Sequence, residues 1–509
     1  MNMHKQHQLV KKEKKINSEG PVMNTRAITP RATDYSQWYL DVIAAAELSC
    51  NSPVRGCMVI KPNGYAIWEN IQRVLNGMFR EKNVQNAYFP LFIPISFLER
   101  EAEHVAGFAK ECAVVTHHRL QLENGKLVPA SPLEEPLIIR PTSETIMYST
   151  FADWIKSHRD LPLLINQWAN IVRWEMRTRP FLRTTEFLWQ EGHTAHATND
   201  EASDFTLQML EVYRRFVEDY LAIPVICGKK SESEKFAGAV FTTCIEAMMQ
   251  DGKALQAGTS HLLGQNFAKA FNVKFLNSAG AEEFVHQTSW GLSTRIIGAL
   301  VMVHADDKGM VIPPKIASVK VAILPVWNNA DSKQSVMTKA EELARNLNDA
   351  GIETVIDRQE GRLGPKSFEW EKKGVPVRIE IGPRDLANDT AVVVRRDTGE
   401  KAHKNFAEIA PFVNGLLDEI QKNLFTRAKK YRDERTFSVD SWEEFQRVLE
   451  ENGGFITAHW CGSADCETQI SEKTKATIRC LPFGQPKEEG QCVFCGKKSE
   501  SRVIFAKAY

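Results

Sequence analysis

The sequence predicts three folded parts: an α+β domain, an α/β domain and a small α/β domain at the C-terminus. Three observations support this division. Residues 34–315 mix amphipathic helix candidates with short β-rich runs. Residues 319–425 alternate between strand-like and helix-like segments. Residues 426–509 hold five of the ten cysteines, all between Cys461 and Cys495.

In the first domain, the clearest helix candidate is Ala66–Glu81. Short β-rich runs occur at Leu137–Arg140 and Val172–Glu175. The segment Ile312–Lys320 contains two prolines and a turn-like change of character, which marks a domain boundary.

The second domain is predicted to be an α/β unit with a parallel-leaning sheet. Strands are expected at residues 319–326, 352–357, 375–382 and 390–397. Helices are expected at 331–351, 365–374 and roughly 406–435, and glycines end the first two. The long last helix is expected to cross into the next domain. There a further helix, Ser441–Glu451, leads to the cysteine-rich end.

The composition fits a large chain whose thiols stay reduced. The length of 509 residues predicts roughly two to four domains. Lys plus Arg and Asp plus Glu both number 64, so any contact with RNA must use a local face and not the global charge. Cysteines spread over a long chain exclude a secreted disulfide scaffold and predict a cytoplasmic protein with one local metal site. No apolar run approaches the length of a membrane span, so no membrane partner is expected.

Residues 1–33 are basic and lack an apolar core, so they do not form a secretory signal. We expect them to be a disordered tail. A nucleic-acid-binding arm and an organelle-targeting segment remain alternatives, and Met23 is an alternative start.

The segment Asn170–His193 indicates a β-hairpin with a basic tip and a polar inner face. Arg173 and Glu175 are expected to point the same way on its first strand, because side chains alternate. The tip contains Arg177, Arg179 and Pro180. The second strand carries Arg183, Glu186, Trp189, Glu191 and His193. Planar, permanently charged guanidinium groups suit phosphate and carboxylate oxygens, and this density of Arg, Glu, Trp and His is too high for an ordinary solvated hairpin.

At this point the sequence resembles a known family. RWE followed by FLRTTEFLWQEGH resembles motif 2 of class II aminoacyl-tRNA synthetases in its prolyl form. Four other segments resemble further elements of that family: VQNAYFPLFIP (Val84–Pro94) motif 1, TSWGLSTRIIGALVMVHAD (Thr288–Asp306) motif 3, RPTSET (Arg140–Thr145) the proline-specific loop, and GTSHLLGQNF (Gly258–Phe267) a second segment on the amino-acid side. Five such segments in order identify the chain as a member of the prolyl-tRNA synthetases over nearly its whole length after the tail.

The resemblance implies a fold and a reaction. The first domain is expected to be a catalytic α+β domain with an antiparallel sheet flanked by helices, and the second an anticodon-binding domain. The expected activity converts L-proline and ATP, with Mg²⁺, to prolyl-adenylate and pyrophosphate, and then transfers the prolyl group to tRNA(Pro). Motif 1 implies a homodimer, because it is an interface element in this class.

For the nucleotide, the resemblance implies that Arg173 binds the α-phosphate and the substrate carboxylate, stabilising charge during in-line attack. Glu175 is expected to accept from the adenine amino group. Arg183 is expected to contact the outer phosphates, and Arg295 to stack on adenine and reach the γ-phosphate. Further residues expected near the nucleotide or its Mg²⁺ are Thr184, Gln256, Thr259 and Ser293.

For proline, the resemblance implies that Glu144, with Thr142 beside it, faces the secondary ammonium. Trp189 and Phe236 are candidates for an apolar cage around the ring. His193 and His261 are expected near this pocket, with Glu191 bracing it. Simpler roles stay open: Thr142 and Glu144 as a helix N-cap and first-turn acid, the aromatic residues as core packing, and the histidines as structural residues.

The C-terminal cysteines form a second pattern. Cys461-x4-Cys466 and Cys492-x2-Cys495 are separated by about 25 residues, which suits a tetrahedral structural Zn²⁺. Reduced free thiols are the alternative, and Cys480 is left over. The archaeal and eukaryotic-like form of the family carries a zinc domain here and tends to end in a tyrosine, as this chain does at Tyr509.

The same form lacks the large editing insertion between motifs 2 and 3. Only about 120 residues separate Arg173 from Arg295 here, which leaves no room for that insertion. A pocket rejects an amino acid of similar or smaller size by only about 1–3 kcal/mol, so any editing of alanine or cysteine is expected to act in trans.

In the second domain, charged residues are expected to read the anticodon, whose two guanines suit Arg or Lys donors and acidic acceptors. The candidates are Lys366, Glu369, Arg378 and Arg384. Any one of them could equally be a solvated surface charge.

Two competing functions remain at this stage. A threonyl- or histidyl-tRNA synthetase belongs to the same class, but the Thr-x-Glu loop with WQEGH favours proline. A catalytically dead paralogue that binds RNA is expected to have lost phosphate-binding arginines. Arg173, Arg183 and Arg295 are all present.

Overall fold

One sheet runs through two of the three predicted domains. The computed structural model describes residues 27–99 and 111–509, and within them an eleven-stranded sheet has the order β20-β21-β25-β22-β9-β10-β11-β14-β8-β7-β3. Seven of its strands come from the first domain: β3 (Gln85–Asn86), β7 (Leu163–Val172), β8 (Glu186–His196), β9 (Val225–Lys229), β10 (Phe241–Met248), β11 (Ala254–Gly264) and β14 (His286–Ser293). All neighbours among these seven are antiparallel except β3 and β7. The prediction of an antiparallel sheet is confirmed.

One face of this sheet is covered by helices. Alternate side chains such as Ile245, Leu255 and Trp290 pack into a single core with them. The covering helices are α1 (Tyr35–Ala45), α2 (Pro62–Arg80), α6 (Asn199–Asp219) and α8 (Arg295–His304). The other set of alternate side chains faces away from this core, because successive residues of a strand point to opposite faces.

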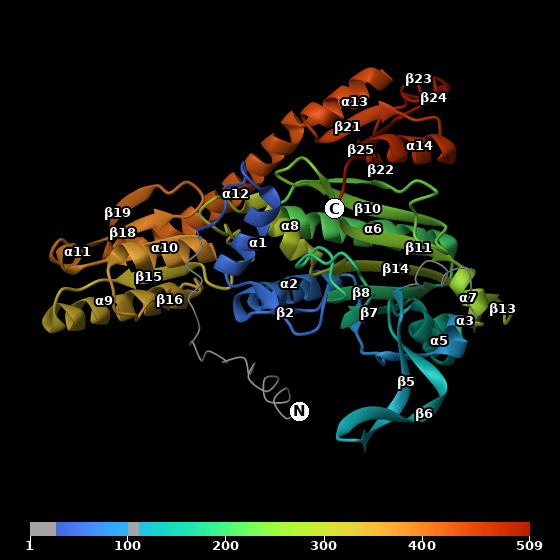
Figure 1. The fold of residues 1–509 in the computed structure, drawn as a ribbon, viewed down its shortest axis with the longest axis horizontal. Coiled ribbons are helices and arrows are strands. Elements are labelled where there is room, and N and C mark those ends of the chain that lie inside the picture. Colours follow the sequence, from blue (N-terminus) through green and yellow to red (C-terminus); the bar gives the residue numbers. More distant parts are fainter. Residues whose placement is uncertain (1–26, 100–110) are drawn as a thin grey trace, which may run out of the picture.

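Smaller elements surround the ends of the strands, on both sides of the sheet. They are β1 (Ser49–Asn51), β2 (Met58–Ile60), β4 (Phe92–Pro94), α3 (Ile95–Glu99), β5 (Ala113–Glu123), β6 (Lys126–Ile139), α5 (Glu144–Trp154), the 3₁₀ turn η2 (His158–Asp160), α7 (Asn266–Ala270), β12 (Lys274–Leu276) and β13 (Glu282–Phe284). The β5–β6 hairpin projects away from the rest of the molecule (Figure 1).

The second domain has a five-stranded sheet in the order β16-β15-β17-β18-β19. Its elements are β15 (Val321–Pro325), α9 (Ala330–Asp349), β16 (Thr354–Ile356), α10 (Leu363–Lys373), β17 (Val377–Ile381), α11 (Pro383–Ala387), β18 (Thr390–Arg395), β19 (Lys401–Asn405) and η3 (Phe406–Glu408). The first three strands in space are parallel, and β18 and β19 are antiparallel. The sheet is therefore mixed. Gly374 ends α10 in the left-handed conformation (φ +77°), as glycine does at helix C-termini.

The long helix α12 (Ile409–Glu434) connects the second domain to the third, as expected from its apolar pattern (Figure 1). The third domain contains β20 (Thr436–Ser438), α13 (Trp442–Glu451), β21 (Phe455–His459), α14 (Ala464–Thr474), β22 (Thr477–Pro482), β23 (Gly490–Gln491), β24 (Lys498–Ser499) and β25 (Arg502–Ala506). The strand β22 pairs with β9, which fuses this domain to the catalytic sheet. Nothing in the sequence pattern indicates that pairing.

A buried charge cluster reinforces the fused edge. The Glu246 carboxylate is fully buried and accepts from the Arg479 guanidinium at 3.1 Å and from Lys230 Nζ at 3.0 Å. Lys230 also donates to the carbonyl oxygen of Arg479 at 2.8 Å. Every charge in the cluster is paired, which a buried ion pair requires.

Residues 27–33, assigned to the tail by sequence, contact the first domain. The backbone N–H of Thr29 donates to Asp41 at 2.9 Å, and Arg31 pairs with Asp307 at 3.2 Å. The ordered chain therefore starts before Asp34, and the rest of the predicted tail, residues 1–26, lies outside the described residues. In the described part, no helix has the length and apolarity to cross a membrane.

Candidate active site

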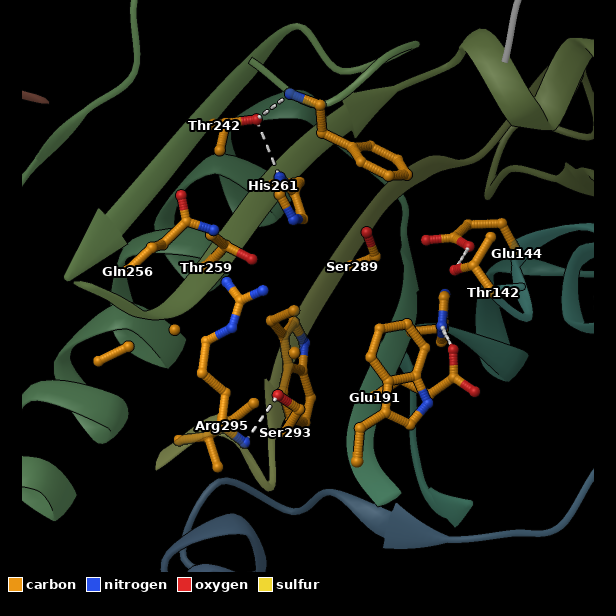
Figure 2. Close-up of a pocket in the computed structure, with 18 of the residues that line it drawn as sticks. Thr142, Glu144, Glu191, Thr242, Gln256, Thr259, His261, Ser289, Ser293 and Arg295 are labelled. Carbon is orange, nitrogen blue, oxygen red and sulfur yellow. Dashed lines mark hydrogen bonds and ion pairs between the residues drawn. The ribbon is translucent and has the colours of Figure 1, made fainter. Parts of the chain in front are cut away.

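Two adjoining cavities lie on the open face of the catalytic sheet. The first, of about 280 Å³, contains every predicted proline residue: Thr142, Glu144, Arg173, Trp189, Glu191, His193, Phe236 and His261. The second, of about 340 Å³, contains Glu175, Arg183 and Thr184. Arg173, Ser293 and Arg295 line both cavities. The predicted nucleotide residues Gln256 and Thr259 line the first (Figure 2).

Strand alternation and register build the floor of the first cavity. Thr242, His261, Ser289 and His193 lie opposite one another in a row across β10, β11, β14 and β8. Residues at odd positions of β8 and β14 face the cavity, while even positions such as Trp290 enter the helix-covered core.

Glu191 joins three elements at the centre of this floor. Its buried carboxylate accepts from Ser143 Oγ at 2.5 Å, from the Ser143 backbone N–H at 3.2 Å and from Gln167 Nε2 at 2.7 Å. It also pairs with His193 Nε2 at 3.1 Å. Ser143 stands between Thr142 and Glu144, so Glu191 holds the predicted proline loop against the sheet.

The contact between Glu191 and His193 shifts the pKa of each group in the direction that favours its charged form. Burial alone would raise the pKa of Glu191, but hydrogen bonds from His193, Ser143 and Gln167 bring it below the ordinary value of 4.5. Burial alone would lower the pKa of His193, but the hydrogen bond with Glu191 and the charge of Glu144 raise it above 6.5. A charged Glu191–His193 pair is close to neutral overall, which leaves Glu144 and Glu234 as the other acidic groups of the cavity.

The pKa of His261 shifts in the opposite direction from that of His193. Burial and the nearby His193 lower its pKa to about 3, so it is neutral. Its Nδ1 lies 2.9 Å from Thr242 Oγ1, which also accepts from the backbone N–H of Phe236 at 2.9 Å. The rings of Phe236 and His261 are 4.7 Å apart, so both form one apolar wall.

Arg173 stands where the two cavities meet. Its Nε donates to the carbonyl oxygen of Pro141 at 2.9 Å, and its guanidinium lies over the Trp189 and Phe187 rings at 5.5 and 5.7 Å. Burial lowers the pKa of Arg173, while the charges of Glu144, Glu111 and Glu191 oppose that shift.

The predicted hairpin is correct in kind but not in its limits. β7 ends at Val172, so Arg173 and Glu175 follow the strand instead of lying in it. The backbone N–H of Arg173 still donates to Thr185 at 2.8 Å, which carries the pairing one step further. Arg183 likewise precedes β8. Both Arg173 and Glu175 line the second cavity, as their predicted common side requires.

Three arginines and two glutamates line the second cavity: Arg173, Arg183, Arg295, Glu111 and Glu175. Burial lowers the pKa of Arg295, and so do the positive charges of Arg173 and Arg183. Figure 2 shows the Arg295 side chain extending toward Gln256 and Thr259. Thr184 Oγ1 is buried and has no hydrogen-bond partner among the described residues. An anion bound here would relieve the repulsion between the guanidinium groups.

Sequence reasoning missed several cavity residues. Ser289 and Phe187 could have been found by counting alternate positions from His193 and Trp189 along their strands. Ser289 Oγ is buried without a partner in the described residues. Glu111 and Glu234 lie in irregular segments, where no periodicity indicates which way a side chain points.

The four predicted anticodon residues differ in their surroundings. Lys366 is buried: its Nζ donates to the carbonyl oxygens of Pro325 and Asp357, both at 3.1 Å. The fold uses this ammonium group internally, and its contact with a base stays a prediction. Glu369 and Arg384 are exposed. Arg378 is buried, but its Nε and Nη1 have no partner in the described chain.

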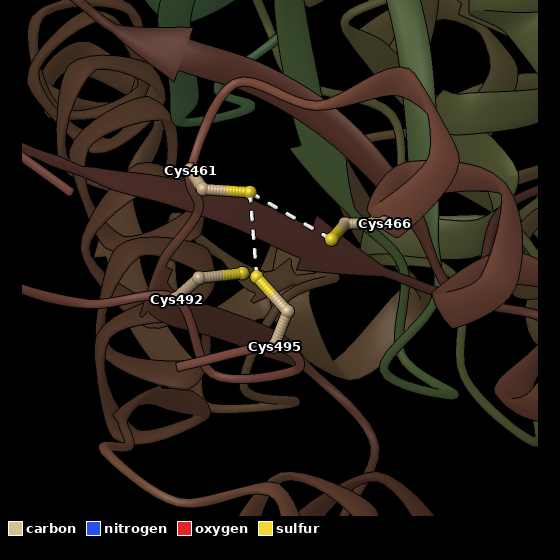
Figure 3. Close-up of side chains that lie close together, drawn as sticks. All are labelled: Cys461, Cys466, Cys492 and Cys495. Carbon is tan, nitrogen blue, oxygen red and sulfur yellow. Dashed lines mark hydrogen bonds between the residues drawn. The ribbon is translucent and has the colours of Figure 1, made fainter. Parts of the chain in front are cut away.

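The four predicted zinc ligands converge. The sulfur atoms of Cys461, Cys466, Cys492 and Cys495 all lie within 4.8 Å of one another (Figure 3). Cys461 Sγ is 3.7 Å from Cys466 Sγ and 3.6 Å from Cys495 Sγ. A tetrahedron with zinc–sulfur bonds of about 2.3 Å has edges of about 3.8 Å, so these thiols fit Zn²⁺. A hydrogen bond from the Lys497 N–H lowers the pKa of Cys495 to about 7.

Comparisons with known proteins agree with this geometry. Residues 127–304 match the family model "tRNA synthetase class II core domain (G, H, P, S and T)", and residues 320–416 match "Anticodon binding domain". Residues 442–509 match "Prolyl-tRNA synthetase, C-terminal". A proline–tRNA ligase of Porphyromonas gingivalis is 56% identical over 489 residues, covering 95% of this chain and 99% of that protein. The chain belongs to the prolyl-tRNA synthetases.

Other relatives within this family match at similar length. The proline–tRNA ligase of Bacteroides fragilis is 56% identical over 491 residues, with 95% of this chain and 99% of the relative covered. The proline–tRNA ligase of Flavobacterium johnsoniae is 55% identical over 491 residues, with 95% of this chain and 100% of the relative covered. This prolyl-tRNA synthetase is thus a class II aminoacyl-tRNA synthetase, and the family predicted from the motifs is confirmed.

The pKa shifts of the Glu191–His193 pair predict a pH-dependent loss in a His193→Gln variant. The stabilising effect of a raised His193 pKa is complete below pH 6.5 and disappears as pH rises through the folded-state value. The stabilising effect of a lowered Glu191 pKa is complete above pH 4.5 and disappears as pH falls through the folded-state pKa. The variant should be less stable by about 3 kcal/mol, with the largest deficit between pH 4.5 and 6.5.

Chemical denaturation of both proteins from pH 4 to 8 measures this difference. His158→Gln, at an exposed histidine, is the control and should leave stability unchanged at every pH. A deficit that does not vary with pH would contradict the ionised pair.

Proposed function

We propose that the two cavities hold proline and ATP, and that Arg173 marks the point where the two substrates react. The observation that carries this proposal is the position of Arg173, whose guanidinium lines both cavities. A proline carboxylate in the first cavity and an α-phosphate in the second would both lie against this one group. A planar guanidinium can donate to both anions at once.

Proline fits the first cavity as a zwitterion. Glu144, braced by a hydrogen bond from Thr142, accepts from the secondary ammonium. Arg173 receives the carboxylate, and Trp189, Phe236 and the neutral His261 enclose the ring. Glu191 and His193 do not contribute net charge. They hold the loop that carries Glu144.

ATP fits the second cavity and its border with the first. Arg183 and Arg295 neutralise the outer phosphates, Glu175 accepts from the adenine amino group, and Thr184 Oγ1 supplies a hydrogen bond that the described chain leaves unused. Gln256, Thr259 and Ser293 offer neutral oxygens near the phosphates. Mg²⁺ takes most of its oxygen ligands from nucleotide phosphates and water, so this sparse donor set is compatible with it.

Catalysis then rests on position and charge. A carboxylate oxygen of proline attacks the α-phosphorus in line, and pyrophosphate leaves from the opposite side. No side chain has to act as a nucleophile. Arg173 stabilises the charge that builds up on the α-phosphate oxygens, and Arg295 that on the leaving group. A hydroxyl group of the 3′-terminal ribose of tRNA(Pro) then attacks the carbonyl carbon of prolyl-adenylate, takes the prolyl group as an ester and releases AMP.

For tRNA, we propose that exposed Glu369 and Arg384 contact the anticodon, together with Arg378. The chemistry that supports this is that guanine presents two acceptors on one edge, which suit the donors of an exposed arginine such as Arg384.

For the third domain, we propose a structural Zn²⁺ on Cys461, Cys466, Cys492 and Cys495. Four thiolates leave no open coordination position, so the metal would hold the domain together and take no part in the reaction. All ten cysteines are free thiols, which suits a reducing cytoplasm.

The proposed reaction predicts that an Arg173→Ala variant loses proline-dependent pyrophosphate exchange. Removing a group that stabilises transition-state charge costs about 10²–10³ in kcat. Circular dichroism should show an unchanged fold, because Arg173 lies at the cavity surface. Arg447→Ala, at an exposed arginine of α13, should keep full activity. Exchange near the wild-type rate in the Arg173 variant would refute the proposal.

The proposed zinc site predicts about one Zn²⁺ per purified chain and a clear loss of metal in a Cys492→Ser variant. Mass spectrometry under native conditions measures the content directly. Cys50→Ser, at an exposed cysteine far from the cluster, should retain the metal. Equal zinc content in both variants would exclude this ligand set.

We also propose a homodimer that uses the motif 1 segment. Tyr88 and Phe92 in this segment are 72% and 45% exposed, and Leu120 and Leu122 of the neighbouring β5–β6 hairpin are 65% and 72% exposed. Sedimentation velocity should give twice the chain mass of 57.6 kDa. Phe92→Glu should shift the protein toward monomer, whereas Phe368→Glu, at an exposed phenylalanine of the second domain, should not. A wild-type monomer would overturn this proposal.

A further inference from the structure

The segment between β9 and β10, residues 230–240, is held in place by the third domain. It contributes two residues to the first cavity, Glu234 and Phe236. Two of its serines are hydrogen-bonded to Glu467, which belongs to α14, more than 200 residues further along the chain. From these contacts we infer that Glu467 is a positioning residue for proline binding. This inference rests on the proposed function of the first cavity.

The contact with Glu467 is specific and buried. Ser231 Oγ donates to Glu467 Oε1 at 2.7 Å, and Ser233 Oγ donates to Glu467 Oε2. Each carboxylate oxygen thus receives one hydroxyl group of the segment. Glu467 is only 7% exposed and Ser231 only 3%, so water does not compete for the bond between them. Ser233 lies at the exposed side of the same carboxylate.

The other attachments of the segment lie toward its two ends. At its start, the Lys230 N–H donates to the Thr242 carbonyl at 2.8 Å, and Lys230 Nζ donates to Glu246 at 3.0 Å and to the Arg479 carbonyl at 2.8 Å. At the far side, the Phe236 N–H donates to Thr242 Oγ1 at 2.9 Å. Between these points Glu232, Ser233 and Glu234 are exposed. The Glu467 carboxylate is therefore what ties the middle of the segment to a rigid element.

Glu467 is itself well fixed. It lies in the first turn of α14, where a carboxylate is favoured by the helix dipole. It directly follows Cys466, one of the four converging cysteines. A metal bound to those thiols would fix the start of α14 and therefore the position of the carboxylate. The cysteine cluster is therefore connected to the cavity in three steps. Glu467 follows Cys466 in the chain, its carboxylate binds the two serines, and the segment that carries these serines places Glu234 and Phe236 in the cavity.

A purely structural role for Glu467 would give a different outcome. If it only fastened two domains together, its loss would lower stability and reduce all kinetic constants alike. If it positions the segment, the effect should fall on proline alone, because Glu234 and Phe236 line the first cavity and not the second.

The test compares Glu467→Gln with the wild type in pyrophosphate exchange. We expect KM for proline to rise by about tenfold, which corresponds to roughly one charged hydrogen bond, while KM for ATP changes by less than about twofold. A Ser231→Ala/Ser233→Ala variant should show the same rise. The triple variant should be no worse than either, because all three changes remove the same contact.

Binding provides a second readout that does not depend on turnover. Proline with a non-hydrolysable ATP analogue should raise the melting temperature of the wild type more than that of Glu467→Gln. Zinc content should stay at the wild-type level in this variant, because the four thiols are intact. Asp465→Asn removes a carboxylate from the same helical turn at an exposed position and should behave as wild type in every assay.

Two outcomes would overturn the inference: an unchanged KM for proline in Glu467→Gln, or a parallel change in both KM values. A Glu144→Gln variant separates this failure from failure of the proposed function. If Glu144→Gln weakens proline binding and Glu467→Gln does not, the cavity is assigned correctly and only the positioning role is wrong. If neither variant affects proline, the cavity assignment itself fails.

Discussion

The buried carboxylate of Glu191 is the interaction on which the proposed substrate site depends. It accepts hydrogen bonds from a loop residue, Ser143, and from two strand residues, Gln167 and His193. A buried charge without such partners would be strongly unfavourable, so the loop, β7 and β8 can only pack together in the arrangement that satisfies it. That arrangement presents Thr142 and Glu144 to the cavity. The sequence suggested a bracing role for Glu191, and its four donors explain how such a brace works.

A second constraint is the crowding of positive charge around the cavities. Arg173, Arg183 and Arg295 are close enough that the first two lower the pKa of the third. Mutual repulsion of this kind is unfavourable in the protein alone and is relieved when a polyanion binds. Under the proposed function, these guanidinium groups are already in place before ATP arrives, which is how enzymes usually stabilise charge that develops in a transition state. Glu144 lies at the other end of the first cavity, where the proposed function places the secondary ammonium of proline.

The sequence predicted which residues line the two cavities better than it predicted the local backbone around them. Trp189, Glu191 and His193 all reach the first cavity from β8, because a strand repeats every two residues whatever it packs against. The sequence placed Arg173 inside the first strand of the hairpin, but β7 ends at Val172. The backbone of Arg173 still pairs with Thr185, beyond the end of the regular strand. Glu111 and Glu234 lie in irregular segments, where local sequence carries no directional signal. Lys366 shows the same limit, because its burial depends on carbonyl groups from two distant segments, at Pro325 and Asp357.

The least predictable feature, the pairing of β22 with β9, also changes how the third domain is understood. Without it, β9 would be an edge strand of the catalytic sheet with unpaired backbone groups. The third domain covers that edge, and the fully paired cluster of Glu246, Arg479 and Lys230 locks the contact from within. Removing one partner of such a buried cluster typically costs about 3–5 kcal/mol. The third domain is therefore part of the same sheet in physical terms, and its four converging cysteines belong to a structure that is continuous with the cavity floor.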